Sequence, residues 1–228
     1  MLKCYFYPLF ILILFFISCS GPDKPEQLKE PGYYPLEAGN FSEFGVEKIN
    51  YTYGQPDKIT KNVIRQLTLV PFADSNGNPI FPQQYASLKP DQSWQTDSVT
   101  ISWLSSDKIF VQENGQTVIK LIFPVAEGLL WNGNEYNSSG KCIFEAMEVN
   151  KPFRIDSLFF PNTVTIIRQN DSTLLSRSKY TETYAPGVGL ICREQLYLRY
   201  CYTADCLGKG IISSGWKKIT RIRKSGKQ

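Results

Sequence analysis

The sequence predicts a mostly β domain whose strands are joined as an antiparallel meander. Apolar and polar residues alternate with a period of two through much of the chain after residue 46, which is typical of half-buried strands. Residues that favour tight turns separate the alternating segments. No segment has the sustained apolar period of 3.6 residues that an amphipathic helix would show. A chain of 228 residues with 42% hydrophobic side chains can bury one core, so we expect one globular domain.

The alternation is clearest over residues 98–104, where one side of the strand is apolar and the other carries Thr100 and Ser102. Residues 36–44 could form a short helix or a turn before the first strand. In order, the predicted strands span residues 46–53, 62–70, 98–104, 107–113, 116–123, 141–149, 162–169, 172–184, 189–201 and 211–223.

Two of the predicted turns bear on function. Asn114-Gly115 lies between two alternating segments and predicts a β-hairpin, because both residues tolerate positive φ. The segment from Asp74 to Asn78 carries the alternating oxygen ligands that open a calcium-binding EF-hand loop. Its glycine is misplaced, Pro79 follows it and no glutamate closes it. We therefore expect a plain turn and no metal.

The N-terminus has the pattern of a signal peptide: Lys3, an apolar stretch from Tyr5 to Ile17, and then polar, turn-forming residues. The stretch is shorter than the roughly 20 residues that span a bilayer comfortably. Phe16-Ile17-Ser18-Cys19 resembles the lipobox of bacterial lipoproteins, which implies cleavage before Cys19, attachment of diacylglycerol to its sulfur and acylation with palmitate. An ordinary signal peptide with an incidental cysteine is the alternative.

Residues 20–31 contain three prolines and alternating charges, which predicts an extended tether. We therefore divide the chain into a signal peptide (1–18), a lipid-anchored tether (19–31) and an antiparallel β domain (32–228). The expected location is the cell envelope, as an outer-membrane lipoprotein. Asp23 and Glu26 loosely resemble the acidic surface-export signal of Bacteroidota lipoproteins, so the choice between the periplasmic and the surface face stays open.

Several enzyme classes are excluded by composition. The chain has no histidine, which removes His-dependent triads and zincin-type sites. It also lacks G-x-S-x-G, P-loop and H-E-x-x-H patterns. We expect no enzymatic activity, no cofactor and no metal.

Charge gives little indication of a partner. The formal net charge is +4, and the excess lies in the last twelve residues, which carry Lys217, Lys218, Arg221, Arg223, Lys224 and Lys227. Such a cluster could bind phosphate or acidic head groups, but a solvated last strand with a frayed end explains it as well. We expect a monomer that contacts a membrane through its lipid, with a lipid or an envelope protein as partner and no nucleic acid.

Apart from Cys4 in the signal peptide and Cys19, the chain has Cys142, Cys192, Cys201 and Cys206. An even number in an exported chain favours disulfides. Cys201 and Cys206 flank a turn between two predicted strands, so we expect them to pair. Cys142–Cys192 is then the implied second pair.

Three phrases of the mature chain resemble a family of Bacteroidota lipoproteins to which no activity has been assigned. They are Tyr34-Pro35-Leu36-Glu37-Ala38-Gly39-Asn40, Trp131-Asn132-Gly133-Asn134-Glu135-Tyr136-Asn137, and Ala185-Pro186-Gly187-Val188-Gly189-Leu190. The last phrase recurs in lipoproteins whose domains are similar to the LolA/LolB carrier fold. The resemblance implies a single curved antiparallel sheet, or half-barrel, with an apolar concave face; a β-sandwich is the alternative.

If that resemblance holds, one face of the sheet should be apolar along its length. The candidates for this ligand-binding face are Val99, Ile101, Trp103, Val164, Ile166, Leu196 and Leu198. Thr100, Ser102, Thr163, Thr165 and Arg199 should then face water. Trp131 is expected to plug a tight loop, with a carbohydrate site at Trp131 and Tyr136 as the alternative.

Two function hypotheses follow. The first is a non-enzymatic envelope lipoprotein that binds an apolar ligand or an envelope partner. The second is a structural or surface-interaction module, for which glycan binding through its aromatic residues is one mode. Asp-Ser pairs at Ser98, Ser157 and Ser172 match the pattern that Bacteroidota O-glycosylate, although such pairs also open strands after turns.

Overall fold

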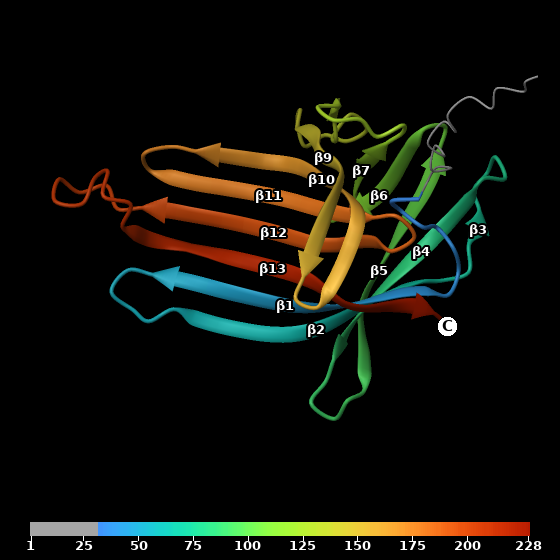
Figure 1. Ribbon diagram of the computed structural model, residues 1–228, viewed down its shortest axis with the longest axis horizontal. Helices are drawn as coiled ribbons and strands as arrows, with labels where there is room; N and C mark the ends of the chain where they lie inside the picture. Colours follow the sequence, from blue (N-terminus) through green and yellow to red (C-terminus); the bar gives the residue numbers. More distant parts are fainter. Residues whose placement is uncertain (1–31) are drawn as a thin grey trace, which may run out of the picture.

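The computed structural model describes residues 32–228, which form one all-β structure of thirteen strands and no helix (Figure 1). The strands are β1 (Asn40–Thr52), β2 (Lys58–Thr68), β3 (Phe72–Ala73), β4 (Pro79–Leu88), β5 (Trp94–Ser105), β6 (Lys108–Glu113), β7 (Gln116–Ile122), β8 (Leu130–Asn132), β9 (Ile143–Ile155), β10 (Leu158–Ser172), β11 (Ser176–Ala185), β12 (Gly189–Tyr200) and β13 (Ile212–Lys227). Within these residues there is accordingly no helix long and apolar enough to cross a membrane. The predicted signal peptide, Cys19 and the predicted tether lie outside the described residues.

All strand pairs are antiparallel, and twelve strands follow the order β7-β6-β5-β4-β2-β1-β13-β12-β11-β10-β9-β8, with β3 paired to β4. The first and last strands are neighbours in the middle of the sheet, with Asn40 opposite Lys227 and Thr52 opposite Ser214. On each side of this central pair the chain runs as a meander. The mostly β, antiparallel, curved-sheet prediction is therefore confirmed.

The two edges of the sheet meet, so that it nearly closes into a barrel. On the β7 edge, Ile119 N–H donates to the carbonyl of Gly133 at 2.9 Å. The Trp131 indole N–H donates to the carbonyl of Ile119 at 3.0 Å, and the Asn137 amide donates to that of Thr117 at 2.7 Å. These three bonds satisfy edge groups that would otherwise be unpaired.

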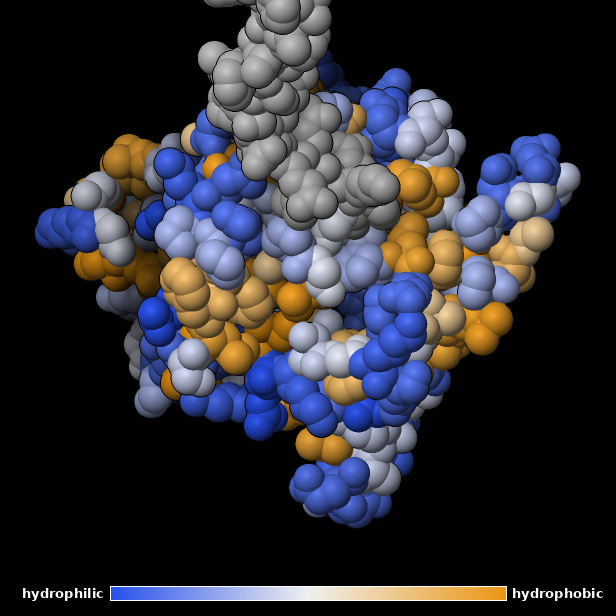
Figure 2. Space-filling model, turned by 45° about the vertical axis from the view of Figure 1, so that its right-hand side comes forward, coloured by the Kyte–Doolittle hydropathy of each residue, from blue (hydrophilic) through white to orange (hydrophobic). Residues whose placement is uncertain are grey.

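We call the line where the two edges of the sheet meet the seam. The larger hydrophobic core lies beside it. Trp131 is 7% exposed and meets the fully buried ring of Phe144 edge-on, at 5.8 Å between ring centroids. Trp131 is thus a plug, as expected, and not an open carbohydrate site. A smaller apolar cluster contains Phe44, Ile191 and Ile222. On the face drawn in Figure 2, hydrophobic patches are interrupted by hydrophilic ones.

Every predicted strand overlaps an observed strand, but the sequence missed β4, β8 and the two-residue β3. Two prolines, Pro79 and Pro82, and two glutamines, Gln83 and Gln84, interrupt the alternation of β4, and β8 has only three residues. Of the two alternatives for residues 36–44, the turn is confirmed at residues 38–39 and the helix is wrong, because β1 begins at Asn40. The basic end is not frayed, because β13 pairs with β1 up to Lys227.

Both turn predictions are confirmed. Glu113 pairs with Gln116 across the β6–β7 hairpin, and Asn114 and Gly115 have φ values of 50° and 76°. In the Asp74 turn, the carboxylate accepts hydrogen bonds from the backbone N–H groups of Asn76 and Asn78, each at 2.8 Å. A plain capped turn accounts for this segment.

The Cys201–Cys206 disulfide is present, with 5.8 Å between the Cα atoms. Cys142 and Cys192, in contrast, are free thiols, so the implied Cys142–Cys192 pair is wrong. Cys142 precedes β9, whereas Cys192 lies on β12, and β10 and β11 separate these strands. Three strand spacings amount to about 14 Å, twice the Cα separation that a disulfide can bridge.

The seam gives a prediction about Gly133. A Cβ atom at this position would lie 2.4 Å from Cζ of Phe144, which cannot retreat because its ring is fully buried. Gly133→Ala should lower the free energy of unfolding by about 1–3 kcal/mol through overpacking. Gly45→Ala is the control, since its Cβ would meet only the flexible Arg223 side chain at 3.4 Å. Urea unfolding measures both; equal stability of the two variants would contradict the packing argument.

Candidate functional site

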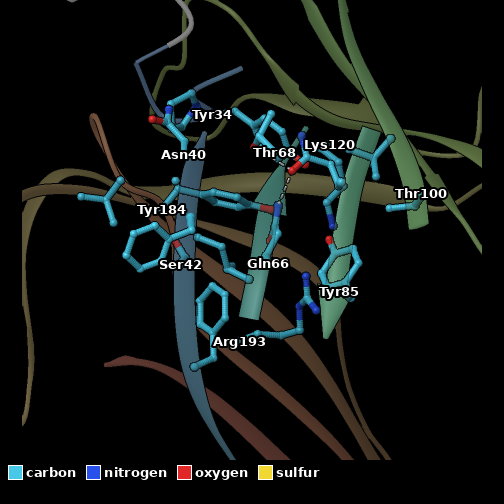
Figure 3. A pocket seen from close by; sticks show the side chains of 18 of the residues that line it. Tyr34, Asn40, Ser42, Gln66, Thr68, Tyr85, Thr100, Lys120, Tyr184 and Arg193 are labelled. Carbon is cyan, nitrogen blue, oxygen red and sulfur yellow. Dashed lines mark hydrogen bonds between the residues drawn. The ribbon is translucent and has the colours of Figure 1, made fainter. Parts of the chain in front are cut away.

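A cavity of about 740 Å³ lies inside the curved sheet (Figure 3). Ten strands contribute to its wall, as do Tyr34 and the loop between β11 and β12. Because alternate residues of each strand point inward, the wall combines side chains that are far apart in the sequence. Most of these side chains are polar, and several are charged.

The deepest charged group is Glu182 on β11, whose side chain is 1% exposed. Lys120 on β7, 3% exposed, donates to both Glu182 oxygens at 2.7 and 2.9 Å and to Glu113 Oε1 at 2.6 Å. Arg193 on β12 donates from Nε to Glu182 Oε1 at 2.7 Å. Tyr184 and Tyr180 also donate their hydroxyls to Glu182, at 3.0 and 3.3 Å. We call Lys120, Glu182, Arg193, Glu113 and Arg168 the buried charge network.

Protonation states in this network follow from burial and neighbouring charge. Burial by itself would raise the pKa of Glu182, but Lys120, Arg193 and Arg168 lower it well below its ordinary value. Burial raises the pKa of Tyr85 to about 12 and that of Tyr184 well above its ordinary value. At neutral pH the carboxylate is therefore charged, while these tyrosines keep their hydroxyl protons and can donate them.

Arg168 is held rigidly. Its guanidinium lies 4.3 Å from the ring centroid of Tyr180 and 4.6 Å from that of Phe144. Its Nη1 lies 3.0 Å from Glu113 Oε2 and donates to the Tyr180 hydroxyl at 3.0 Å. Its buried Nε has no hydrogen-bond partner among the described residues. Arg168 thus serves as a fixed positive charge at the end of the network.

A series of uncharged, hydrogen-bonded side chains crosses another part of the cavity wall. Gln83, 1% exposed, donates to Ser102 Oγ at 3.0 Å. Its carbonyl accepts from Thr68 Oγ1 at 2.9 Å and from Gln66 Nε2 at 3.1 Å. These bonds satisfy the buried amide and fix the side chains that face the cavity.

The seven residues predicted to form an apolar ligand-binding face do not line the cavity. On β5 the predicted orientation is wrong: Val99 is 55% exposed, whereas Ser98 and Thr100 line the cavity. Ile101 and Trp103 share the face of Val99, because alternate residues of a strand point the same way. Trp103 stacks there on Phe110, with 5.3 Å between ring centroids.

The predicted apolar residues on β10 and on β12 lie on different faces of the sheet. Val164 and Ile166 on β10 lie inside and are fully buried in the core, opposite Tyr184 and Glu182. On β12, Arg193 and Gln195 line the cavity, so Leu196 and Leu198, at the alternate positions, lie on the opposite face. Thr163 and Ser102, predicted to face water, are 1% and 0% exposed. Arg199 is exposed as predicted.

Sequence analysis missed the buried charge network, although its members left a signal. Lys120 interrupts the apolar run from Val118 to Ile122, and Glu182 stands between Tyr180 and Tyr184 on one face of its strand. A charged residue at a position whose neighbours on the same face are apolar or aromatic indicates a buried ion pair. Only the fold could show that the two pair with each other.

The predicted O-glycosylation sites lie at the surface, and one of them, Ser98, is also at the cavity wall. Ser98, Ser157 and Ser172 are exposed, and their O-glycosylation stays a prediction. Within residues 32–228, His, Cys, Asp and Glu side chains do not gather in groups of three or more that could hold a metal.

Neither a comparison with protein-family models nor one with curated proteins finds a match. Among solved structures, a predicted lipoprotein of Parabacteroides distasonis has 10% sequence identity to this chain and a TM-score of 0.39. The match covers 85% of this chain and 98% of that protein. A TM-score of this size supports no inference about function.

The network gives a prediction about stability. Glu182→Gln should lower the free energy of unfolding by about 3–5 kcal/mol, because it removes the counter-charge shared by the buried Lys120 and the partly buried Arg193. Glu113→Gln is the control with a smaller expected loss, since that side chain is 25% exposed. Urea unfolding at pH 7 measures both variants. Equal losses would contradict the central role of Glu182.

The pH dependence of the same variant is a second measurement. Folding lowers the pKa of Glu182, so its stabilising contribution is complete above its unfolded pKa of about 4.3 and is lost as pH falls toward the folded value. The stability difference between wild type and Glu182→Gln should therefore narrow below about pH 4.3. A difference that stays constant through this range would show that the carboxylate charge is not what stabilises the fold.

Proposed function

We propose that this protein is a non-enzymatic cell-envelope lipoprotein, anchored through Cys19, whose β domain binds a polar small molecule in the interior cavity. The observation that carries the proposal is the polar wall of that cavity. Burying paired charges seldom stabilises a protein more than apolar side chains of the same volume would. We therefore attribute the charges at the cavity to recognition of a ligand.

The size of the cavity supports this proposal. Ligand pockets usually measure about 300–1,000 Å³, and this one falls within that range. Rigid aromatic side chains such as Tyr34, Tyr85 and Tyr184 provide part of the wall, and hydrogen-bonding groups provide the rest. An apolar ligand is less suited, because the cavity wall lacks the apolar face that the sequence predicted.

The first described residues lie beside the cavity wall. Gly32, the first described residue, accepts a hydrogen bond from Gly187 N–H at 2.7 Å, in the loop between β11 and β12. Gly187 and Val188 of this loop line the cavity, as does Tyr34. A lipid-anchored tether over residues 19–31 would thus join the domain beside the cavity wall. We place the protein in the outer membrane on the basis of the resemblance to Bacteroidota lipoproteins.

Filling the cavity tests ligand binding. Thr100 and Val99 are adjacent on β5 but point to opposite faces, so Thr100→Trp should occupy the cavity while Val99→Trp should project into solvent. Native mass spectrometry of the full-length protein, extracted from its own membranes in mild detergent, should find a small polar adduct. The adduct should be lost in Thr100→Trp and kept in Val99→Trp. An adduct that both variants keep, or a lipid adduct in its place, would contradict a polar ligand in the cavity.

Lipidation is tested separately. Cys19→Ala should leave the precursor uncleaved and free of radiolabelled palmitate, because the thiol is the acceptor of the lipid. Cys4→Ala, within the signal peptide, is the control and should be labelled normally. Unchanged labelling of the Cys19 variant would show that the anchor lies elsewhere.

A further inference from the structure

One corner of the cavity carries positive charge that the protein does not neutralise. Lys218 on β13 lines the cavity, and among residues 32–228 it forms neither an ion pair nor a side-chain hydrogen bond. Arg193 uses its Nε on Glu182, whereas its two terminal nitrogens have no partner within the same part of the chain. We call Arg193 and Lys218 the cationic corner.

The charges around this corner leave an excess of positive charge. In the buried charge network, Lys120, Arg168 and Arg193 face two carboxylates, so one positive charge remains before Lys218 is counted. Lys48 on β1 lies directly opposite Lys218 on β13 in the strand register. Like Lys218, it forms no ion pair among the described residues. Burial, then Arg193 and Lys48, lower the pKa of Lys218, as expected for a cation without a counter-ion.

The neighbours of the corner are hydrogen-bonding and aromatic groups. Tyr180, Gln195 and Lys218 are opposite one another on β11, β12 and β13 and thus form one row across the sheet. Glu182 and Arg193 occupy the adjacent row. Gln195 also lines the cavity, and its side-chain amide forms no hydrogen bond with another described residue. This amide can both donate to and accept from a hydroxyl group.

Together these observations describe a site for an anion attached to a hydroxyl-rich body. We propose that the cavity binds a small acidic sugar, whose carboxylate or phosphate lies between Arg193 and Lys218 and whose hydroxyls bond to Gln195. This proposal rests on the proposed function and specifies its ligand. A metal cation does not suit the corner, because both carboxylates of the network already bind cationic side chains. An oxyanion supplies the missing counter-charge and accepts the free N–H groups of Arg193.

The proposal is tested with three sugars that differ chiefly in charge: D-glucose, D-glucuronate and D-glucose 6-phosphate. Isothermal titration calorimetry is performed on the full-length protein in a non-ionic detergent. At least one acid should bind about tenfold or more tightly than glucose, and the preferred acid distinguishes carboxylate from phosphate recognition. Lys218→Gln should reduce that affinity about tenfold.

Lys217→Gln is the matched control. Lys217 is the preceding residue on β13, points to the opposite face and pairs with Glu194 at 3.3 Å, so its removal should leave the affinity for the acid unchanged. Equal binding of the three sugars, insensitivity to Lys218→Gln, or no binding of either acid would each overturn the proposal. The proposed function is judged independently, by the adduct that Thr100→Trp is expected to remove.

Discussion

The interior of this domain depends on one carboxylate. Glu182 accepts hydrogen bonds from Lys120, Arg193, Tyr184 and Tyr180, which come from three different strands. Charges buried this deeply would be strongly unfavourable without such pairing. The network therefore constrains which faces of β7, β11 and β12 can point inward, and so ties the register of those strands to the chemistry of the cavity.

The second constraint is closure of the sheet. A long antiparallel sheet exposes two edges that could pair with other chains. Here the β7 edge bonds to Gly133 and to the Trp131 indole, so that the sheet curves around its own interior. Because the buried core packs beside the seam, the remainder of the interior stays open. The cavity is thus a consequence of apolar packing concentrated at one side of a curved sheet.

Sequence patterns identified most strands because backbone alternation is a local property. The β6–β7 hairpin followed from Asn114-Gly115, and the Cys201–Cys206 disulfide followed from cysteines that flank one turn. The Cys142–Cys192 pairing failed because it depended on strand order, which no local pattern encodes. Likewise β4 was hidden by its prolines, although it pairs with both β2 and β5.

The candidate site shows the same division. Alternation separates Val99 from Thr100 whatever the fold, since neighbouring residues of a strand point to opposite faces. It does not specify which face is internal; that depends on whether partners across the barrel are apolar or polar. On β10 the residues of the inner face include Val164 and Ile166, whereas on β5 they include Ser98 and Thr100. The sequence by itself thus determined most of the strands, the two turns and the short disulfide, all of which are local. Only the tertiary structure decided that Lys120 meets Glu182, 62 residues away, and that Lys218 faces the cavity without a counter-charge, because strand order and curvature bring distant side chains together.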